Sequence, residues 1–260
     1  MNPGIYPLEH YLCLIPLGFV IGVVGTLIGA GGGFILTPIL LLLYPGESAN
    51  TITCISLSVT FANALSGSMA YARMKRIDYR SGIMFSAAAI PGAILGALTT
   101  YYVSRKVFDL VFAIALISAA AFLLIRPVTK EKTSGPLPHL NRTLGVLVSV
   151  VVGFVSSFLG IGGGIIHVPA LVNLLNFPVH IATATSHFIL ANVTFVGVVV
   201  HIASGTFQHG VRRALSLAVG VLVGAQIGAR LSNRVHGTMI IRLLAVALLL
   251  VGIRLIASVW

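Results

Sequence analysis

Gly29-Ala30-Gly31-Gly32-Gly33-Phe34 interrupts an apolar run and is followed by Ile35-Leu36-Thr37-Pro38. A similar stretch, Gly160-Ile161-Gly162-Gly163-Gly164-Ile165, occurs 131 residues further along, and the same shift relates Pro38 to Pro169. Two glycine-rich breaks at corresponding positions of two apolar halves indicate a transporter's binding site, because a broken helix leaves backbone groups free to hold a substrate. The sequence therefore predicts a duplicated membrane transporter.

The composition places the chain in a lipid bilayer. Of its 260 residues, 57% are hydrophobic and 8% are charged, and the mean hydropathy is +1.05, whereas a soluble domain typically carries about 25% charged residues. A membrane-spanning helix needs roughly 20 apolar residues. This length therefore accommodates at most about ten crossings and no separate soluble domain.

The charge balance favours an anion over a nucleic acid or a cation as the partner. Sixteen Lys and Arg residues against five Asp and Glu residues give a formal net charge of +11. Most of the basic residues lie in short loops, where such residues orient spans and contact membrane lipids, so no nucleic-acid partner is expected. Among the acidic residues only Asp109 falls in an apolar segment, whereas cation pumps commonly need carboxylates at depth.

Motifs of other functional classes do not appear in the sequence. Neither glycine string is followed by Lys-Ser or Lys-Thr, as a nucleotide phosphate loop requires, and there is no HExxH or similar metal-ligand cluster. An enzyme, a cofactor and a bound metal are therefore not expected. A lipid-modifying membrane enzyme and a structural subunit of a larger complex stay open as alternatives.

A polar stretch divides the chain into two similar halves. We predict an all-α integral membrane protein with a first repeat at residues 1–126, a cytoplasmic linker at 127–141 and a second repeat at 142–260, together forming one transmembrane domain. Each repeat would hold a glycine-broken hairpin and three transmembrane helices, for roughly 8–10 membrane segments in all.

The orientation of the two repeats depends on how the glycine breaks are used. If each break bends one crossing, the repeats are parallel; if each break is the tip of a hairpin, the repeats are inverted. The positive charges of the loops fit both arrangements. One helix from Leu12 to Tyr44 would be about 50 Å long, well over the ~30 Å bilayer core. Length therefore favours hairpins and inverted repeats.

The glycine strings themselves are candidate binding elements. Consecutive glycines at a helix start expose several N–H groups, and the helix dipole adds roughly half a positive charge there. Two such elements near the membrane midplane would suit a small anion. The candidates are Gly31, Gly32 and Gly33 in the first half and Gly162, Gly163 and Gly164 in the second. The alternative is that these glycines only permit a tight turn and close packing.

Polar side chains in the following segments are the next candidates, because an unpaired polar group in hydrocarbon is costly. Ser56, Thr60 and Asn63 have the i, i+4, i+7 spacing of one helix face, and the matching segment contributes Ser186, His187 and Asn192. The alternative is that the hydroxyls bond carbonyls of their own helix or bridge helices.

Further residues have candidate roles in transport. His187, and His167 after the second glycine string, titrate near neutral pH and could carry a proton with the anion; the alternative is a neutral buried histidine. Gln226 and Arg230 lie one turn apart toward a span end. Arg230 either extends to the headgroups or guards an anion vestibule.

The duplicated motifs resemble those of the TauE/SafE family of sulfite exporters, also called the TSUP permeases. The matching stretches are GAGGGFILTP and GIGGGIIHVP, each followed by a Ser/Thr-rich helix, ITCISLSVTFANALSG and ATATSHFILANVTFVG. The resemblance runs from about Leu14 to Ile256. It implies a multi-pass permease of the bacterial or archaeal cell inner (cytoplasmic) membrane that moves sulfite, or sulfonates such as sulfoacetate and sulfolactate.

Carried over by position, the family's marked residues are the glycines and the proline of each string, together with Ser56 and Ser186. The first half departs from the pattern, because it reads Cys54-Ile55-Ser56 where the family often shows Gly/Ala-Thr-Ser, which the second half keeps as Ala184-Thr185-Ser186. The family does not specify the anion or the direction of transport.

These observations predict a secondary transporter of small sulfur-containing oxyanions that works by alternating access around a midplane site. A channel-like anion pore is the alternative. Expected partners are the anionic substrate and membrane lipids, and the sequence leaves proton coupling and a homodimer open.

Overall fold

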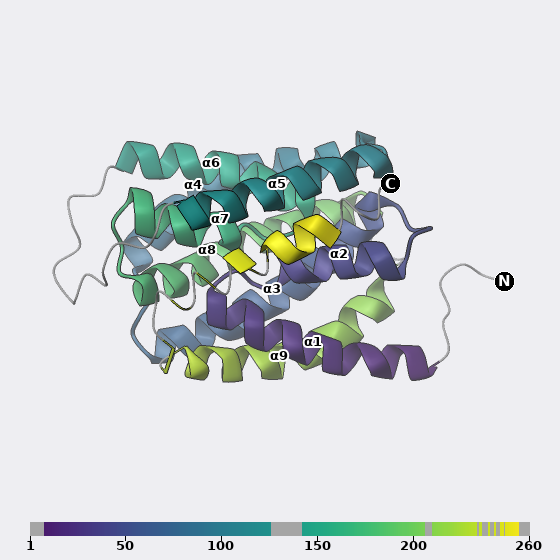
Figure 1. The fold of residues 1–260 in the computed structure, drawn as a ribbon, viewed down its shortest axis with the longest axis horizontal. Helices are drawn as coiled ribbons and strands as arrows, with labels where there is room; N and C mark the ends of the chain where they lie inside the picture. The colour runs from purple at the N-terminus through teal and green to yellow at the C-terminus, as the bar shows by residue number, and fades with distance from the viewer. Residues whose placement is uncertain are drawn as a thin grey trace.

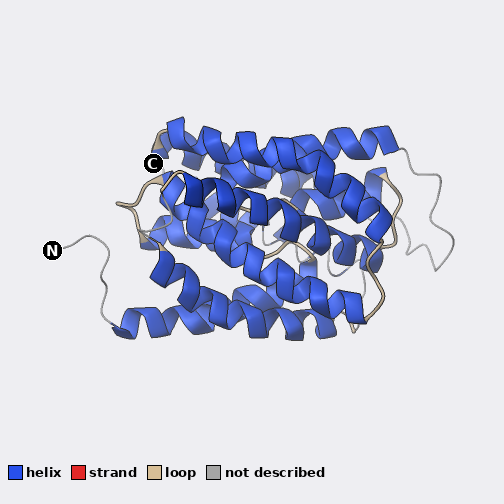
Figure 2. Cartoon of the chain, turned by 180° about the vertical axis from the view of Figure 1, so that it is seen from behind, coloured by secondary structure: helices blue, strands red, loops and turns tan. Residues whose placement is uncertain are grey.

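The computed structural model describes residues 8–125, 142–205 and 210–232, with shorter pieces between 234 and 254. Within these residues the chain forms only helices and loops (Figure 2), which confirms the all-α prediction. The polar stretch at 127–141 lies outside the described residues. The helices are α1 (Leu8–Ile28), α2 (Gly33–Leu43), α3 (Ala49–Arg73), α4 (Tyr79–Thr99), η1 (Thr100–Tyr102), α5 (Arg105–Ile125), α6 (Arg142–Leu159), α7 (Gly164–Pro169), η2 (Ala170–Leu174), α8 (Val179–Ala203) and α9 (Val211–Leu231).

Six of the described helices are long and apolar enough to cross a membrane. They cover Tyr11–Ile28, Ala49–Arg73, Tyr79–Tyr102, Arg142–Leu159, Val179–Ala203 and Val211–Leu231. The segments Gly33–Leu43 and Gly164–Leu174 are shorter apolar helices. The chain is therefore a multi-pass membrane protein with two short helices that follow the glycine strings.

Helices α3 and α8 form the centre of the bundle and run antiparallel. Gly67 of α3 lies against His187 near the start of α8, and Leu57 lies against Gly197 nearer its end. Helix α1 packs along α9 on one edge of the bundle and α4 packs along α6 on the other (Figure 1). Helix α9 also packs on α3, and α4 packs on α8, so each outer pair of helices covers one side of the central pair.

Glycines make the close helix contacts at both edges. A Cβ at Gly92 or Gly96 of α4 would overlap the backbone of α6, and a Cβ at Gly224 or Gly228 of α9 would overlap the backbone of α1. Such contacts bring backbones together where lipid supplies no hydrophobic drive between helices.

Leucine at Gly92 is expected to separate α4 from α6. The new side chain would meet Val150 O and the Phe154 amide, and backbone atoms cannot rotate aside as a side chain can. Overpacking of this kind costs about 1–3 kcal/mol, so the Tm of the purified protein in detergent should fall. Gly46→Leu is the control, because a Cβ there meets nothing within 4 Å. Equal Tm values for the two variants would contradict the contact.

Charged side chains hold the connection between α2 and α3. Arg213, at the start of α9, pairs with Glu47 through its Nη2 and the Oε1 atom at 2.6 Å. Arg105 donates to the carbonyl oxygens of Glu47 and Leu41 at 2.8 and 2.9 Å, and it pairs with Asp109 at 2.9 Å. Asp109, the acidic residue of an apolar segment, is thus neutralised within the first turns of α5.

The same contacts give the direction of α9. It begins beside Glu47, which precedes α3, and its last turns pack near the end of α3, where Ala229 joins a cluster with Tyr71 and Ala70. Helix α9 therefore runs parallel to α3. Arg230 lies at the end of the bundle where α3 finishes with Arg73.

Candidate functional site

Each glycine string forms a sharp turn in the left-handed region of the backbone. The φ angles are 81°, 76° and 80° at Gly29, Gly31 and Gly32, and 70°, 80° and 86° at Gly160, Gly162 and Gly163. Only glycine adopts such angles at little cost. Gly32 then lies against Ile21 of α1, and Gly163 lies against Val152 of α6. In both halves the chain has folded back along the helix that precedes the turn.

The two turns are buried and touch one another. A Cβ placed on Gly33 would lie 2.8 Å from Ile161 O and 2.9 Å from Gly160 O, and one placed on Gly164 would lie 2.5 Å from Gly29 O. The side chains of Thr60 and Leu190 lie against both Gly31 and Gly162. Since Thr60 and Leu190 are each near the middle of their 25-residue helix, the turns meet halfway along the bundle.

Backbone N–H groups remain free at both turns. In the described part of the chain, the N–H groups of Gly32, Gly33 and Phe34 donate to no backbone acceptor, and neither do those of Gly163, Gly164 and Ile165. A buried N–H without a partner is costly. These groups are therefore available to an acceptor that the chain itself does not supply.

Ser56 and Ser186 hold the turn of the opposite half in place. Ser56 Oγ donates to Gly160 O at 2.6 Å, and Ser186 Oγ donates to Gly29 O at 3.3 Å. Thr37 Oγ1 supports the first contact by lying 2.8 Å from Ser56 Oγ. Both serines thus bridge a central helix to a glycine turn, which matches the helix-bridging alternative for these hydroxyls.

His187 and Asn63 belong to a buried polar network beside the first turn. Thr26 Oγ1 donates to Asn63 Oδ1 at 2.8 Å, and His187 Nε2 lies 3.3 Å from the same hydroxyl. Because a threonine has one hydroxyl proton, His187 Nε2 acts as the donor to Thr26. Tyr71 adds a hydrogen bond to Thr26 O at 2.8 Å. His187 Nδ1 and Asn63 Nδ2 keep no partner among the described residues.

Asn192, Gln226 and Arg230 lie away from the turns. Asn192 Nδ2 donates to Phe188 O of its own helix at 2.8 Å and lines a cavity on the outer face of α3 and α8. Gln226 Nε2 bridges α9 to α3 by donating to Ser66 O at 2.7 Å. Arg230 is exposed in the last turn of α9. The structure therefore brings the glycines, Ser56, Asn63, Ser186 and His187 together and leaves these three outside.

Three buried hydroxyls have no hydrogen-bond partner among the described residues: Oγ of Ser156 and of Ser157, at the end of α6, and Oγ1 of Thr60. Thr60 was a sequence-predicted candidate, whereas the two serines were not. Ser156 lies against Gly163, and Ser157 lies against Gly197. The signal that points to them is their position, since Ser156-Ser157 corresponds to Gly25-Thr26 ahead of the first glycine string.

A bundle of apolar helices with two inward-facing glycine turns defines a multi-pass membrane protein with an interior polar site. The chain matches the family model described as Sulfite exporter TauE/SafE over residues 14–255, and it belongs to this family. This is a family of transporters, not of enzymes.

Relatives from bacteria and an archaeon support the assignment. The probable membrane transporter protein YunE of Bacillus subtilis (strain 168) is 30% identical, over 95% of this chain and 97% of its own length. A probable membrane transporter protein of Methanocaldococcus jannaschii is 27% identical, over 76% of each chain. No solved structure matches the chain.

Proposed function

We propose that this protein is a secondary transporter of a small sulfur-containing oxyanion, sulfite or an organosulfonate, in the cell inner membrane. The observation that carries the proposal is the meeting of two glycine turns at the middle of the bundle, with unpaired N–H groups on both. Fixed N–H groups and hydroxyls in a site without water stabilise negative charge well. The family to which the chain belongs is consistent with such a substrate.

Inverted repeats at residues 1–126 and 142–260, joined by the linker at 127–141, are part of the proposal. The packing supports them, because α1 on α9 matches α6 on α4, and α3 on α9 matches α8 on α4. The antiparallel course of α3 and α8 is what a two-fold axis in the membrane plane would require. Arg230 and the basic residues after α3 would then face the cytoplasm with the linker.

The second glycine turn is the better anion site of the two. Ser156 lies against Gly163 and Ser157, the next residue of α6, lies against Gly197, and neither hydroxyl has a partner among the described residues. The matching positions of the first half are Gly25, which has no side chain, and Thr26, whose hydroxyl already donates to Asn63. The oxygens of the anion would accept from these serines, from Thr60 and from the N–H groups of Gly163 and Gly164. Hydrogen bonds to a charged group are about twice as strong as neutral ones.

Transport requires the two turns to separate. Because Gly33 lies against Gly160 and Ile161, the anion reaches the N–H groups only when one hairpin moves relative to the other. Ser56 and Ser186 would release and remake their bonds to the opposite turn during this movement, which is the alternating access expected of repeats around a fixed site. His187, whose Nε2 donates to Thr26 beside the first turn, is a group able to carry a proton.

Removal of both unpaired serine hydroxyls should weaken substrate binding. The variant Ser156→Ala, Ser157→Ala keeps the shape of α6 and removes two donors, each worth about 1.5–3 kcal/mol when the partner is charged. We expect the KM for sulfite export from proteoliposomes to rise about tenfold or more. Parallel assays with sulfoacetate, sulfolactate and sulfate would identify the preferred anion.

Ser216→Ala is the matched control, since Ser216 is on α9 and, among the described residues, bonds the carbonyl of Arg212 in its own helix and no other group. An unchanged KM in the double serine variant, with wild-type activity for sulfite, would move the binding site elsewhere. Wild-type protein that transports none of the sulfur oxyanions would reject the substrate class.

A further inference from the structure

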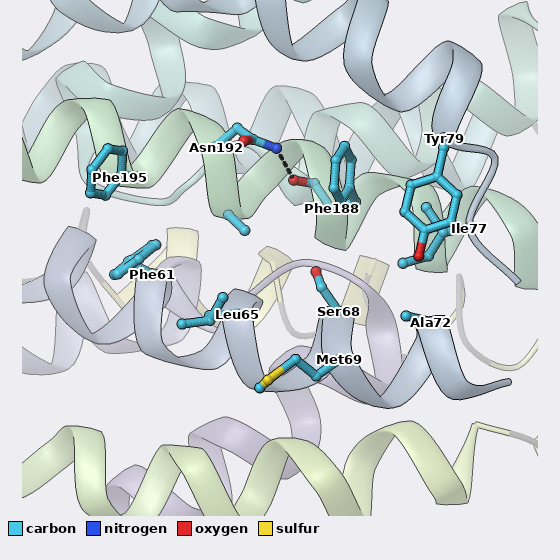
Figure 3. Close-up of a pocket in the computed structure, with 11 residues that line it drawn as sticks. Phe61, Leu65, Ser68, Met69, Ala72, Ile77, Tyr79, Phe188, Asn192 and Phe195 are labelled. Carbon is cyan, nitrogen blue, oxygen red and sulfur yellow. Dashed lines mark hydrogen bonds between the residues drawn. The ribbon is translucent and has the colours of Figure 1, made fainter. Parts of the chain in front are cut away.

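A cavity of about 340 Å³ lies on the outer face of the bundle between α3 and α8 (Figure 3). An aromatic pair closes each end: Phe61 and Phe195 have ring centroids 5.5 Å apart, and Tyr79 and Phe188 have theirs 5.5 Å apart at the other end. We call this space the α3/α8 groove. Its walls are mostly apolar and carry no acidic or basic side chain among the lining residues, so it does not suit a small oxyanion.

The groove has the depth of one leaflet. Phe61 and Ala72 both line it on α3, and at 1.5 Å per residue the distance between them is roughly 17 Å, compared with about 15 Å for half of the hydrocarbon core. Phe61 directly follows Thr60, which contacts the glycine turns halfway along the bundle. The groove therefore runs from the level of the turns to the end of α3.

A polar group without a partner marks where an amphiphile would bind. Ser68 is 7% exposed, and its Oγ has no hydrogen-bond partner among the described residues; Figure 3 shows this oxygen directed into the space between α3 and α8. It lies one turn below Ala72, roughly 6 Å from the end of the groove.

Basic residues follow the outer end of the groove. Arg73, Lys75 and Arg80 are exposed, and Arg76 is half-buried. The Nη1 atom of Arg76 is buried and unpaired within the described part of the chain. Its neighbour in sequence, Ile77, lines the groove. A basic cluster at the end of an apolar groove between transmembrane helices is suited to an anionic headgroup whose acyl chain lies in the groove.

We propose that the α3/α8 groove binds one anionic phospholipid, with an acyl chain between the two aromatic pairs, an ester group on Ser68 and the phosphate on the basic residues that follow α3. The chemistry differs from that of the glycine turns on the opposite faces of these helices. A lipid seated there would contact α3 and α8 along one leaflet, and these are the two helices against which the turns pack.

Native mass spectrometry of the full chain in detergent tests this directly, with phosphatidylglycerol and phosphatidylcholine of identical acyl chains as probes. We expect phosphatidylglycerol to bind at least fivefold tighter than phosphatidylcholine, since one basic residue near an anionic headgroup contributes about a fivefold change in affinity. Arg76→Gln should remove about fivefold of that preference. Ala191→Phe, which fills the groove, should weaken both lipids.

Val199→Phe is the matched control, because Val199 lies further along α8, is 46% exposed and does not line the groove. Equal binding of the two lipids, or an Arg76→Gln variant with the wild-type preference, would overturn the proposal even if Ala191→Phe failed to fold. Displacement of bound phosphatidylglycerol by sulfite would instead make the groove a substrate vestibule. If a dimer with the mass of two chains carries no lipid, the groove would instead be the contact surface for a second copy of the chain. Either result would also overturn the proposal.

Discussion

Alanine at Gly164 is expected to reduce the transport rate by up to about 100-fold while leaving the helices of the bundle intact. Its Cβ would lie 2.5 Å from Gly29 O and 2.6 Å from the Ala30 Cα, and real Cβ atoms essentially never approach so closely. Both obstacles are backbone atoms of the opposite turn, so only a displacement of one turn relieves the overlap. At the upper end of the overpacking cost, about 3 kcal/mol, the loss of transport rate would be roughly 100-fold.

Gly33→Ala should have the same effect from the other side of the contact. A Cβ there would meet Ile161 O at 2.8 Å, Gly160 O at 2.9 Å and Thr60 Oγ1 at 2.7 Å. Because Gly160 O is also the acceptor of Ser56, pushing this turn away would break the bond that holds it. The N–H groups of the displaced turn would then no longer point to the same place as those of the other turn.

The measurement is the initial rate of sulfite export from proteoliposomes loaded with equal amounts of each variant. Gly46→Ala is the control, since Gly46 has open space around it. A wild-type rate in Gly164→Ala would mean that contact between the turns has no part in transport. A Tm for each variant in detergent separates loss of transport from loss of folding.

The positions of the glycine turns could be predicted from the sequence, because a glycine string that recurs within apolar segments breaks a helix at the same place in each half. In the structure a short helix follows each string: α2 in the first half, and α7 with η2 in the second. What the string could not reveal is that the two turns lie against each other. That contact depends on how α1, α3, α6 and α8 pack, which is a property of side chains far apart in the chain.

Asn192 illustrates why the polar candidates were harder to place. Its position in a Ser/Thr-rich segment groups it with Asn63, but the shift of 130 that relates Ser56 to Ser186 carries Asn63 to Val193. One residue of difference turns a side chain by about 100° around a helix. Asn63 consequently points into the bundle beside Thr26, whereas Asn192 lines the outer groove. The position of a residue around its helix decides whether its side chain faces the bundle interior or the outer groove, and residue type alone does not.

The unpaired serines show a second limit. Hydroxyls in membrane helices commonly bond a carbonyl one turn back, as Thr194 and Ser149 do here. Residue type therefore does not single out Ser156 and Ser157, although their position ahead of the glycine string matches that of Gly25-Thr26. They become candidates only when their Oγ atoms are found buried without partners. Whether a buried hydroxyl has a hydrogen-bond partner depends on the tertiary structure, so it could not be predicted from the sequence.

Glutamine at Glu47 is expected to destabilise the protein by about 2–3 kcal/mol. The side chain of Arg213 is 2% exposed and that of Glu47 is 25% exposed, so the substitution leaves a buried guanidinium without its countercharge. Removing one partner of a buried pair costs about 3–5 kcal/mol, and the partial exposure of Glu47 lowers this figure. Tyr44, whose ring centroid lies 4.5 Å from Arg213 Cζ, would retain part of the interaction.

A double-mutant cycle measured by Tm in detergent tests this expectation. Arg212→Gln is the control, because Arg212 is the exposed neighbour of buried Arg213 and surface substitutions usually change stability by within about 0.5 kcal/mol. The combined variant Glu47→Leu, Arg213→Leu should be less destabilised than the sum of its single variants, since an apolar pair leaves no uncompensated charge. Additive effects would mean that the two side chains act independently. They would then not hold the connection between α2 and α3 to α9, and that connection would owe its position to packing and to the hydrogen bonds of Arg105.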